Sequence, residues 1–463
     1  MSAKKYDRMG NFFNEKFNYI GSGKTGGKAS GLAFIHDFLS QNFTEKEFSN
    51  LAVSIPAMAV ILTDVFDKFM ELNSFNIDEL IENTDEEIAI LFQQALLPAT
   101  IVGDLRDLIT KYKKPLAIRS SSLIEDSIDK PFAGVYETKM IPNNQLDPNQ
   151  RFKKLVEAIK LVYASVFFKK SRDYFKAVEE NIKEEKMAVI IQEVVGLKHN
   201  KLFYPTISGV VKSYNFYPVG NKKPRDGVVN LALGLGKTIV DGEISWSYSP
   251  KYPNSPPPFN SIDDMLKMTQ TKFWAINLDK IDTYNPIKET EYLTQESIVQ
   301  AEEHGVLADL CSTFHYENGM IYTGTFVKGP RIIDFAPILK TKKYPLNEAI
   351  KKLLQISEEK MGTKVEIEFA VNIENKKIRI GFLQLRPILV SDKMVNIDLN
   401  NYDSNDILIS SSNVMGNGVI ENIKDIVFVK PSNFKAGNTK QIAIEIEQIN
   451  DNFIRANQKY MLI

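Results

Sequence analysis

The stretch at residues 115–138, PLAIRSSSLIEDSIDKPFAGVYET, limits the possible folds of this chain more than any other. A short β run from Pro115 to Ile118 delivers Arg119 into three serines, an acidic pair and a Phe-Ala-Gly turn. This pattern favours an anion-binding loop, because Arg offers a planar fork of donors and Ser hydroxyls and turn N–H groups add more. An ordinary surface loop with a structural Arg–Glu pair is the alternative that the local sequence leaves open.

A glycine cluster near the N-terminus is a second anion-binding pattern. Residues 21–31 read GSGKTGGKASG and precede a helix-like segment. Glycines let the backbone approach a phosphate, the helix N-terminus adds partial positive charge, and Lys24 and Lys28 add full charges. The P-loop pattern is absent in both registers, because Ser22 and Asn18 stand where its first glycine belongs. A glycine-rich turn that caps a helix is the alternative.

A third pattern combines acid, amide and Arg side chains near residue 380. Two runs alternate apolar and polar residues, KVEIEFAVN at 364–372 and KIRIGFLQLRPI at 377–388. They predict adjacent strands joined by a polar turn, with Glu366 and Glu368 beside Gln384 and Arg386. Carboxylate and amide oxygens suit Mg²⁺, and Arg386 can neutralise charge on a transferred phosphoryl group. For Glu366 we favour a cross-strand salt bridge, since one carboxylate is enough to reach a metal.

Taken in order along the chain, these pieces resemble the ATP-binding domain of the phosphoenolpyruvate synthase and pyruvate phosphate dikinase family. The matching segments are GGKASGLA (26–33), SIPAMAVILTDVFDKFM (54–70), the loop at 118–138, MAVIIQEVV (187–195), SGVV (208–211), GLGKTIVDG (234–242), IEFAV (367–371) and LQLRP (383–387). The resemblance implies an α/β (α+β) fold of the ATP-grasp type with two subdomains. It also implies that the β-phosphoryl group of ATP passes to a carrier histidine and then to an acceptor.

The resemblance implies roles for individual residues. Lys28, Arg119 and Arg386 would hold phosphates, with Arg119 and Arg386 as the catalytic residues; Glu368 and Gln384 would hold Mg²⁺; Gln192 and Glu193 would face the adenine; Gly134 and Thr138 would belong to the phosphate loop. ATP and Mg²⁺ are therefore the expected cofactors.

Three features depart from the family pattern. The Gly-Glu dipeptide of the glycine turn reads Gly236-Lys237 here, which reverses a charge near the nucleotide. The chain between Glu368 and Gln384 is longer than the usual family hairpin. Residues 318–339 read as an extra hairpin that has no place in the family pattern.

The carrier histidine of the family stands in a Thr-Ser-His type motif, which none of the four histidines here shares: His36, His199, His304 and His315. We therefore expect this chain to be the nucleotide-binding part of a larger enzyme, or a stand-alone relative without the relay. The predicted parts are an ATP-grasp subdomain at 1–246 with the glycine motif and phosphate loop, a second at 247–395 with the Mg²⁺ hairpin, and an incomplete swivelling-domain-like segment at 396–463.

Composition narrows the class of protein. A net charge of −1 argues against a nucleic-acid partner. The single cysteine, Cys311, excludes an intrachain disulfide and fits a reducing, cytoplasmic compartment. The N-terminus has no apolar segment typical of a signal peptide, and the longest apolar stretch, residues 51–62, is too short to span a bilayer.

Two functions of different class follow. The first is the ATP-binding domain of a phosphoenolpyruvate synthase-like dikinase, a kinase-type transferase that uses a carrier histidine outside this chain and pyruvate as the final acceptor. The second is a non-catalytic nucleotide-binding or regulatory module. Within the first class, an antibiotic or a glucan is an alternative acceptor. The intact set of phosphate and metal residues favours the first function, and the absent histidine favours the second.

Overall fold

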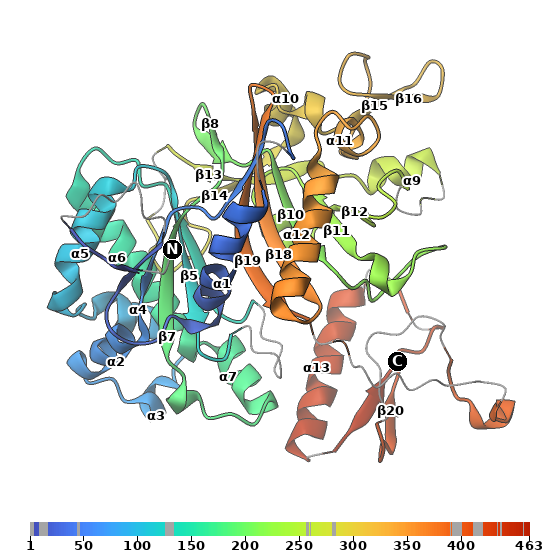
Figure 1. The fold of residues 1–463 in the computed structure, drawn as a ribbon. Helices are drawn as coiled ribbons and strands as arrows, with labels where there is room; N and C mark the ends of the chain where they lie inside the picture. The colour runs from blue at the N-terminus through green and yellow to red at the C-terminus, as the bar shows by residue number, and fades with distance from the viewer. Residues whose placement is uncertain are drawn as a thin grey trace. The chain divides into compact units, whose positions relative to one another are not determined.

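The computed structural model divides the chain into two units, residues 1–389 and 390–463 (Figure 1). It describes residues 4–8, 17–43, 47–125, 134–255, 259, 261–279, 284–388, 390, 401–410, 420–432, 434–435, 438–456 and 458–463. Helices and strands alternate along the first unit, so the predicted mixed α/β class is confirmed. The middle of the predicted phosphate loop, residues 126–133, lies outside the described residues.

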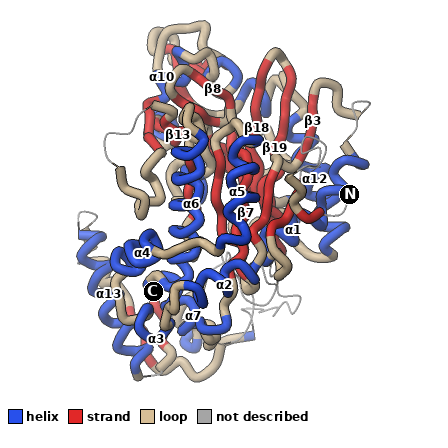
Figure 2. The backbone as a smooth tube through the Cα atoms, turned by 90° about the vertical axis from the view of Figure 1, so that its left-hand side faces the viewer, coloured by secondary structure: helices blue, strands red, loops and turns tan. Residues whose placement is uncertain are grey.

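A six-stranded sheet, called here the first sheet, has helices on one face. Its strands in spatial order are β1 (Lys4–Lys5), β2 (Phe17–Ile20), β4 (Met58–Ile61), β7 (Met187–Glu193), β5 (Leu116–Ser122) and β6 (Thr138–Ile141). The main helices around its core are α2 (Thr63–Leu72), α4 (Asp85–Gln94), α5 (Ala99–Lys111) and α6 (Pro148–Ala164), and Figure 2 shows α5 and α6 in front of the strands. Alternate strand residues such as Ile61, Ile118 and Ile191 pack under the helices. Met58 and Val60 belong to a separate core on the opposite face.

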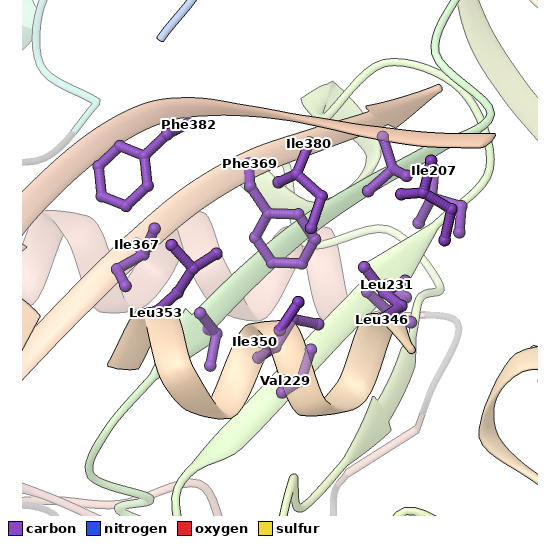
Figure 3. Close-up of a cluster of buried hydrophobic side chains, with 14 of the residues drawn as sticks. Ile207, Val229, Leu231, Leu346, Ile350, Leu353, Ile367, Phe369, Ile380 and Phe382 are labelled. Carbon is purple, nitrogen blue, oxygen red and sulfur yellow. The ribbon is translucent and has the colours of Figure 1, made fainter. Parts of the chain in front are cut away.

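A second six-stranded sheet contributes to that separate core. Its strands in order are β12 (Trp246–Tyr248), β11 (Val228–Ala232), β10 (Ile207–Lys212), β18 (Val365–Glu374), β19 (Lys377–Pro387) and β3 (Leu51–Ser54). Helix α12 (Leu346–Met361) packs on this sheet through Leu346, Ile350 and Leu353 (Figure 3). Gly209 is required opposite Phe369, because a Cβ at Gly209 would lie 2.1 Å from the Phe369 ring.

Helix α1 (Gly26–Asn42) contacts both large sheets, through β5 of the first and β19 of the second. Its buried stripe of Ala29, Leu32, Ile35 and Leu39 follows helical spacing and joins the shared core. The predicted helix after the glycine cluster is therefore confirmed, and it begins at Gly26. Its N-terminus consequently lies beside the strand that carries Arg119.

Smaller elements complete the first unit. A third sheet has the order β14 (Leu293–Ser297), β13 (Lys272–Asn277), β9 (Leu202–Tyr204) and β8 (Leu197–His199), and a fourth has the order β16 (Met320–Thr323), β15 (Ser312–His315) and β17 (Arg331–Ile332). The remaining helices are α3 (Ile77–Leu80), α7 (Lys169–Ala177), α8 (Lys237–Val240), α9 (Ile262–Lys267), α10 (Ile298–Glu303) and α11 (Ala336–Leu339).

Two predictions of local structure are corrected. The extra hairpin expected at 318–339 begins earlier, with β15 at Ser312, because the reversal falls at Gly319, whose φ is +67°. The sequence at 150–182 predicts one long helical stretch, whose aromatic residues would form a packing stripe against the sheet. It is broken instead, since Phe168 is extended and α7 starts after it.

The described residues of the second unit form one α-helix, one short 3-10 helix (Ser404–Asp406) and one short sheet. Strands β20 (Asp425–Val427) and β21 (Tyr460–Leu462) pair in parallel, and α13 (Thr439–Arg455) connects them. Phe453 of the helix stacks on Tyr460, with ring centroids 4.6 Å apart. The predicted divisions at 246/247 and 395/396 stay predictions. Across the described ranges, no single helix is long and apolar enough to cross a membrane, although α4 and α5, bent by 90°, together meet the requirements of length and composition.

Candidate functional site

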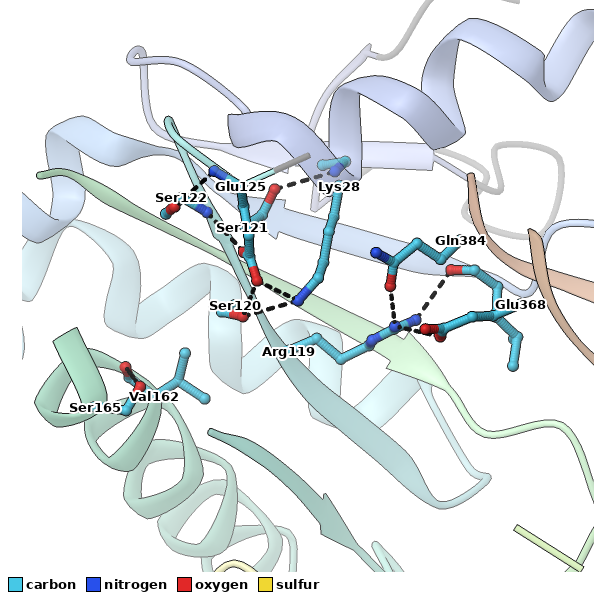
Figure 4. Close-up of polar contacts among 12 residues, drawn as sticks. Lys28, Arg119, Ser120, Ser121, Ser122, Glu125, Val162, Ser165, Glu368 and Gln384 are labelled. Carbon is cyan, nitrogen blue, oxygen red and sulfur yellow. Dashed lines mark hydrogen bonds and ion pairs between the residues drawn. The ribbon is translucent and has the colours of Figure 1, made fainter. Parts of the chain in front are cut away.

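Arg119 is the centre of a polar cluster between the two large sheets (Figure 4). Its Nη2 donates to Glu368 Oε2 at 3.1 Å and to Gln384 Oε1 at 2.7 Å. Its Nη1 donates to the Leu383 carbonyl oxygen at 3.0 Å. Arg119 belongs to β5 of the first sheet, whereas its three partners belong to β18 and β19 of the second. The structure therefore brings together one predicted phosphate ligand and both predicted metal ligands.

The β18–β19 hairpin positions the two oxygens through its register. A two-residue turn with positive φ at Asn375 (50°) and Lys376 (61°) joins the strands, which is the turn geometry that suits the twist of a tight hairpin. Glu368 lies beside Gln384, as the alternation predicts, and the two residues pair directly because the register shifts between Glu368 and Phe369. The shift leaves Leu383 without a partner in the ladder, so its carbonyl oxygen is available to Arg119.

Lys28 forms a second charged group, at the end of β5. Its Nζ lies 2.5 Å from Glu125 Oε1 and donates to Ser120 Oγ at 3.0 Å. Glu125 is only 1% exposed and also accepts from the Ser122 backbone N–H at 3.1 Å. This carboxylate therefore keeps Lys28 in place with a buried, fully bonded partner.

The serines belong to the strand rather than to the loop that the sequence suggested. Strand β5 continues to Ser122, and the three serines are fully buried. Ser121 Oγ accepts from the Ala29 backbone N–H at 3.0 Å and donates to the Thr25 carbonyl at 2.9 Å, which fastens the start of α1 to β5. Gly26 is needed at this junction, because its φ is +74° and a Cβ there would lie 1.8 Å from the Ser121 carbonyl oxygen.

A buried carboxyl group lies close to this junction. Glu185 is 5% exposed and accepts hydrogen bonds from the backbone N–H groups of Leu123 at 3.2 Å and Lys186 at 3.0 Å. The pKa of Glu185 is raised to about 7, mainly by burial and also by the negative charge of Glu125, while the two N–H groups oppose the change. The protonation of Glu185 therefore changes near neutral pH, close to the strand end that holds Lys28.

Arg386 lies next to the central cluster along β19. It forms an ion pair with Glu366, its register partner on β18, and Glu366 also lies 3.0 Å from Lys212 Nζ. Glu366 is thus the cross-strand salt-bridge partner that the sequence favours. Since residues two apart on a strand share a face, Arg386 and Gln384 point to the same side of the sheet.

Three other predicted ligands lie on the first sheet, and the strand register shows which of them share the face of Arg119. Thr138 is the register partner of Arg119 on β6. Gln192 pairs with Ala117 and shares the face of Arg119, whereas Glu193 pairs with Leu116, on the helix-covered face. The Glu193 side chain instead lies 3.1 Å from Lys114. Only the Gln192 side chain of this pair is therefore on the site face.

Gly134 stands at the end of the phosphate loop and is exposed, with φ +64° and open space where a Cβ would be. Its backbone conformation, rather than crowding, favours glycine. Among the described residues, the sequence did not predict four contacts. Lys28 contacts Ser120 and Glu125, Glu366 contacts Lys212, and Arg119 contacts the Leu383 carbonyl oxygen. The quoted loop contained Ser120 and Glu125, but no local pattern pointed to Lys212 or to the bulge at Leu383.

Sequence comparison decides the family. The sequence profile described as "Pyruvate phosphate dikinase, AMP/ATP-binding domain" matches residues 23–406, which include every residue of this site. The chain belongs to the pyruvate phosphate dikinase AMP/ATP-binding domain family. The resemblance seen in the sequence motifs is thereby confirmed, and so is the mixed α/β fold class.

A relative of this pyruvate phosphate dikinase-type domain is the "Uncharacterized phosphotransferase YvkC" of Bacillus subtilis (strain 168). The two are 26% identical over 198 residues, which are 41% of this chain and 20% of the relative. The chain thus aligns with about a fifth of the length of that relative. Family and relative together make this chain a nucleotide-binding domain of a phosphotransferase family.

Proposed function

We propose that this chain binds Mg-ATP between its two large sheets, in an ATP-grasp manner, as the ATP-binding part of a phosphoenolpyruvate synthase-like dikinase. The phosphoryl group would pass to a carrier histidine outside this chain and finally to pyruvate. The observation that carries the proposal is the meeting of Glu368 Oε2 and Gln384 Oε1 at one nitrogen of Arg119, at 3.1 and 2.7 Å.

The donor set fits a magnesium ion. A carboxylate oxygen and an amide oxygen from neighbouring strands converge on a single positively charged atom, and these are the ligand types that Mg²⁺ takes from proteins. When bound, Mg²⁺ would neutralise charge on the nucleotide phosphates. Glu368 and Gln384 would hold it, and the guanidinium of Arg119 would become free for phosphate oxygens.

The cations of the site can bind phosphate by exchanging partners. Lys28, Arg119 and Arg386 are each paired with a carboxylate in the structure, namely Glu125, Glu368 and Glu366. A nucleotide polyphosphate offers the same kind of charge-assisted hydrogen bond to these donors. Positioned cations of this kind stabilise the charge that moves during phosphoryl transfer.

We prefer a catalytic domain to a non-catalytic binding module because the site keeps all the predicted phosphate-binding cations and metal-binding oxygens. A module that only holds a nucleotide needs neither two metal-ligand oxygens nor a third cation at Arg386. An antibiotic or glucan acceptor would leave the ATP site unchanged, so pyruvate is proposed on the family resemblance. The buried, unpaired Cys311 supports a cytoplasmic location.

Calorimetry of ATP, AMP and GTP binding, with and without Mg²⁺, tests the proposal. Mg²⁺-dependent ATP binding is expected for the unaltered chain, together with weaker binding for Arg119→Ala by about tenfold or more, as for the loss of a charge-assisted contact. Arg106→Ala is the matched control, because Arg106 is an exposed residue that contacts Asn149 and the Phe152 ring in the first unit.

Unchanged ATP affinity in Arg119→Ala would exclude a phosphate role for Arg119. Absence of ATP binding to the unaltered chain would exclude the proposed function as a whole. AMP formation on addition of a carrier-histidine domain would separate the dikinase from the binding module, since the module would bind ATP without turnover.

A further inference from the structure

Lys237 lies at the start of α8, on a turn that two other strands hold in place. The Leu235 backbone N–H donates to the Trp274 carbonyl of β13 at 2.9 Å, and Ser208 Oγ of β10 donates to the Gly234 carbonyl at 2.5 Å. Gly234 has φ +84°, and a Cβ there would lie 2.7 Å from the Trp274 carbonyl oxygen. The backbone that presents Lys237 is therefore fixed.

This turn packs on the same face of the first sheet that carries Arg119. Leu235 belongs to a small apolar cluster with Ala117 of β5, and Met140 of β6 packs against that cluster. Ala117 and Arg119 are two residues apart on β5, so their side chains share a face. Lys237 is two residues after Leu235, which contacts this face.

Lys237 is a partly buried cation whose acidic partners are more exposed than it is. Its Nζ lies 3.1 Å from Asp241 Oδ2, 3.2 Å from Glu289 Oε2 and 5.8 Å from the centre of the Trp274 ring. Burial lowers the pKa of Lys237, but Glu289 and Asp241 outweigh that effect and raise it, so the side chain stays charged. The Lys237 side chain is 16% exposed, whereas Glu289 is 33% and Asp241 39% exposed.

The electrostatics connect this group to the strand next to Arg119. Burial raises the pKa of Glu137, Glu289 raises it further, and Lys170 and Lys237 oppose the change. Glu137 immediately precedes Thr138, which is the register partner of Arg119. Lys237 and Glu289 therefore act electrostatically on Glu137, which is next in the chain to the register partner of Arg119.

We propose that Lys237 is an additional phosphate ligand of this chain, which exchanges Glu289 for a phosphate oxygen of the bound nucleotide. The inference rests on the proposed function and adds to it a role for Lys237, a residue of the matched segment 234–242 that departs from the family pattern. The exchange is favourable at Lys237 because Glu289 is partly exposed and regains water when it leaves.

The proposal gives Lys237 an effect that depends on the number of phosphates. A cation close to the candidate phosphate site attracts a nucleoside triphosphate more strongly than a monophosphate, because the triphosphate carries more negative charge. Lys237→Met should therefore weaken ATP binding about tenfold and AMP binding far less. Glu289→Gln should tighten ATP binding, because Lys237 then loses one of its two acidic partners.

Lys251 provides a matched control. Its Nζ lies 2.9 Å from Asp226 Oδ1 and 5.3 Å from the centre of the Tyr252 ring, so it has the same type of acidic and aromatic partners. Lys251→Met should leave ATP affinity unchanged. Calorimetry gives the affinities, and melting temperatures of all variants show whether each one folds.

Tryptophan fluorescence is a readout that is independent of turnover. The chain has two tryptophans, so Trp246→Phe leaves Trp274, next to Lys237, as the single reporter. In that variant ATP should change the emission of Trp274, and Lys237→Met should abolish the change. Equal ATP affinities for the unaltered chain and Lys237→Met, with equal melting temperatures, would overturn the inference.

A purely structural ion pair predicts a different pattern. Both Lys237→Met and Glu289→Gln would then lower the melting temperature, and neither would change the ATP affinity, which would overturn the inference. If the unaltered chain bound no ATP, the proposed function would fail first and this inference with it. The two failures are therefore distinguishable.

Discussion

Replacing Glu368 by Gln should change ATP binding in opposite directions with and without magnesium. In the structure Glu368 Oε2 holds Arg119 Nη2 at 3.1 Å, and the same oxygen is a proposed ligand of Mg²⁺. Without metal, the carboxylate competes with phosphate for the guanidinium. With metal, it leaves Arg119 and contributes its charge to the ion. One substitution therefore acts in opposite directions under the two conditions.

The size of the effect follows from the geometry of the pair. Two unit charges at 3.1 Å attract by about 5 kcal/mol at an effective dielectric constant of ~20. Most of this is offset, because the side chains are only 13% and 25% exposed and have lost hydration. Hydrogen bonds to charged groups contribute roughly 1.5–3 kcal/mol net, and neutral ones about 1 kcal/mol. Glu368→Gln should therefore free roughly 1 kcal/mol, which tightens metal-free ATP binding about fivefold.

Calorimetry in EDTA and in excess Mg²⁺ measures both arms of this prediction. Tighter ATP binding is expected in EDTA and weaker binding in Mg²⁺. Glu302→Gln is the control, because Glu302 Oε1 is paired with Arg331 Nη2 at 2.5 Å, outside the site. Equal weakening in EDTA and in Mg²⁺ would show that Glu368 does not compete for Arg119, and the exchange of partners would be refuted.

Two further predictions concern stability. The pKa of Glu185 is raised to about 7 in the fold, so the folded state holds this proton more tightly than the unfolded state. The contribution of Glu185 to the free energy of unfolding should be fully present below about pH 4.5 and should fall by ~3 kcal/mol as the pH rises through 7. Urea unfolding at several pH values should show this fall, and Glu185→Gln should flatten it; a fall of equal size in the variant would assign it to other groups. Gly26→Ala should cost more than ~2 kcal/mol, because its Cβ would lie 1.8 Å from the Ser121 carbonyl oxygen. Gly305→Ala has the same φ of +74° with open space around it and should cost about 1 kcal/mol; equal losses of melting temperature would show that the clash is relieved at no cost.

The predicted hairpin shows what neighbouring residues encode. Alternation at 364–372 and 377–388 fixes which side chains share a face, and the polar turn between the runs fixes where the chain reverses. The neighbourhood of Glu368 and Gln384 follows from those two facts, but their direct pairing also needs the bulge at Leu383, because a regular ladder from this turn would pair Glu368 with Leu383. The glycine cluster is similar, since the sequence indicates a turn before a helix and α1 begins there.

Other outcomes depended on packing that local patterns do not contain. The serines after Arg119 are polar enough to read as a loop, yet they are fully buried in β5, because Glu125 and the start of α1 satisfy their hydrogen bonds. The break at Phe168 interrupts the long helical stretch that the sequence predicts, and the two resulting helices pack on the same core. The partner of Lys237, Glu289, stands in a segment without any motif.

The sequence by itself determined the periodic elements, the family and the residue types of the site, because strands, turns and helix starts are set by residues a few positions apart. Tertiary structure alone decided which charges meet. Arg119 lies 249 positions from Glu368 and 265 from Gln384. Their contact exists because the first sheet turns the Arg119 face of β5 toward the hairpin of the second. The order of strands across a sheet and the stacking of two sheets are set by burial over the whole chain, which no local pattern specifies.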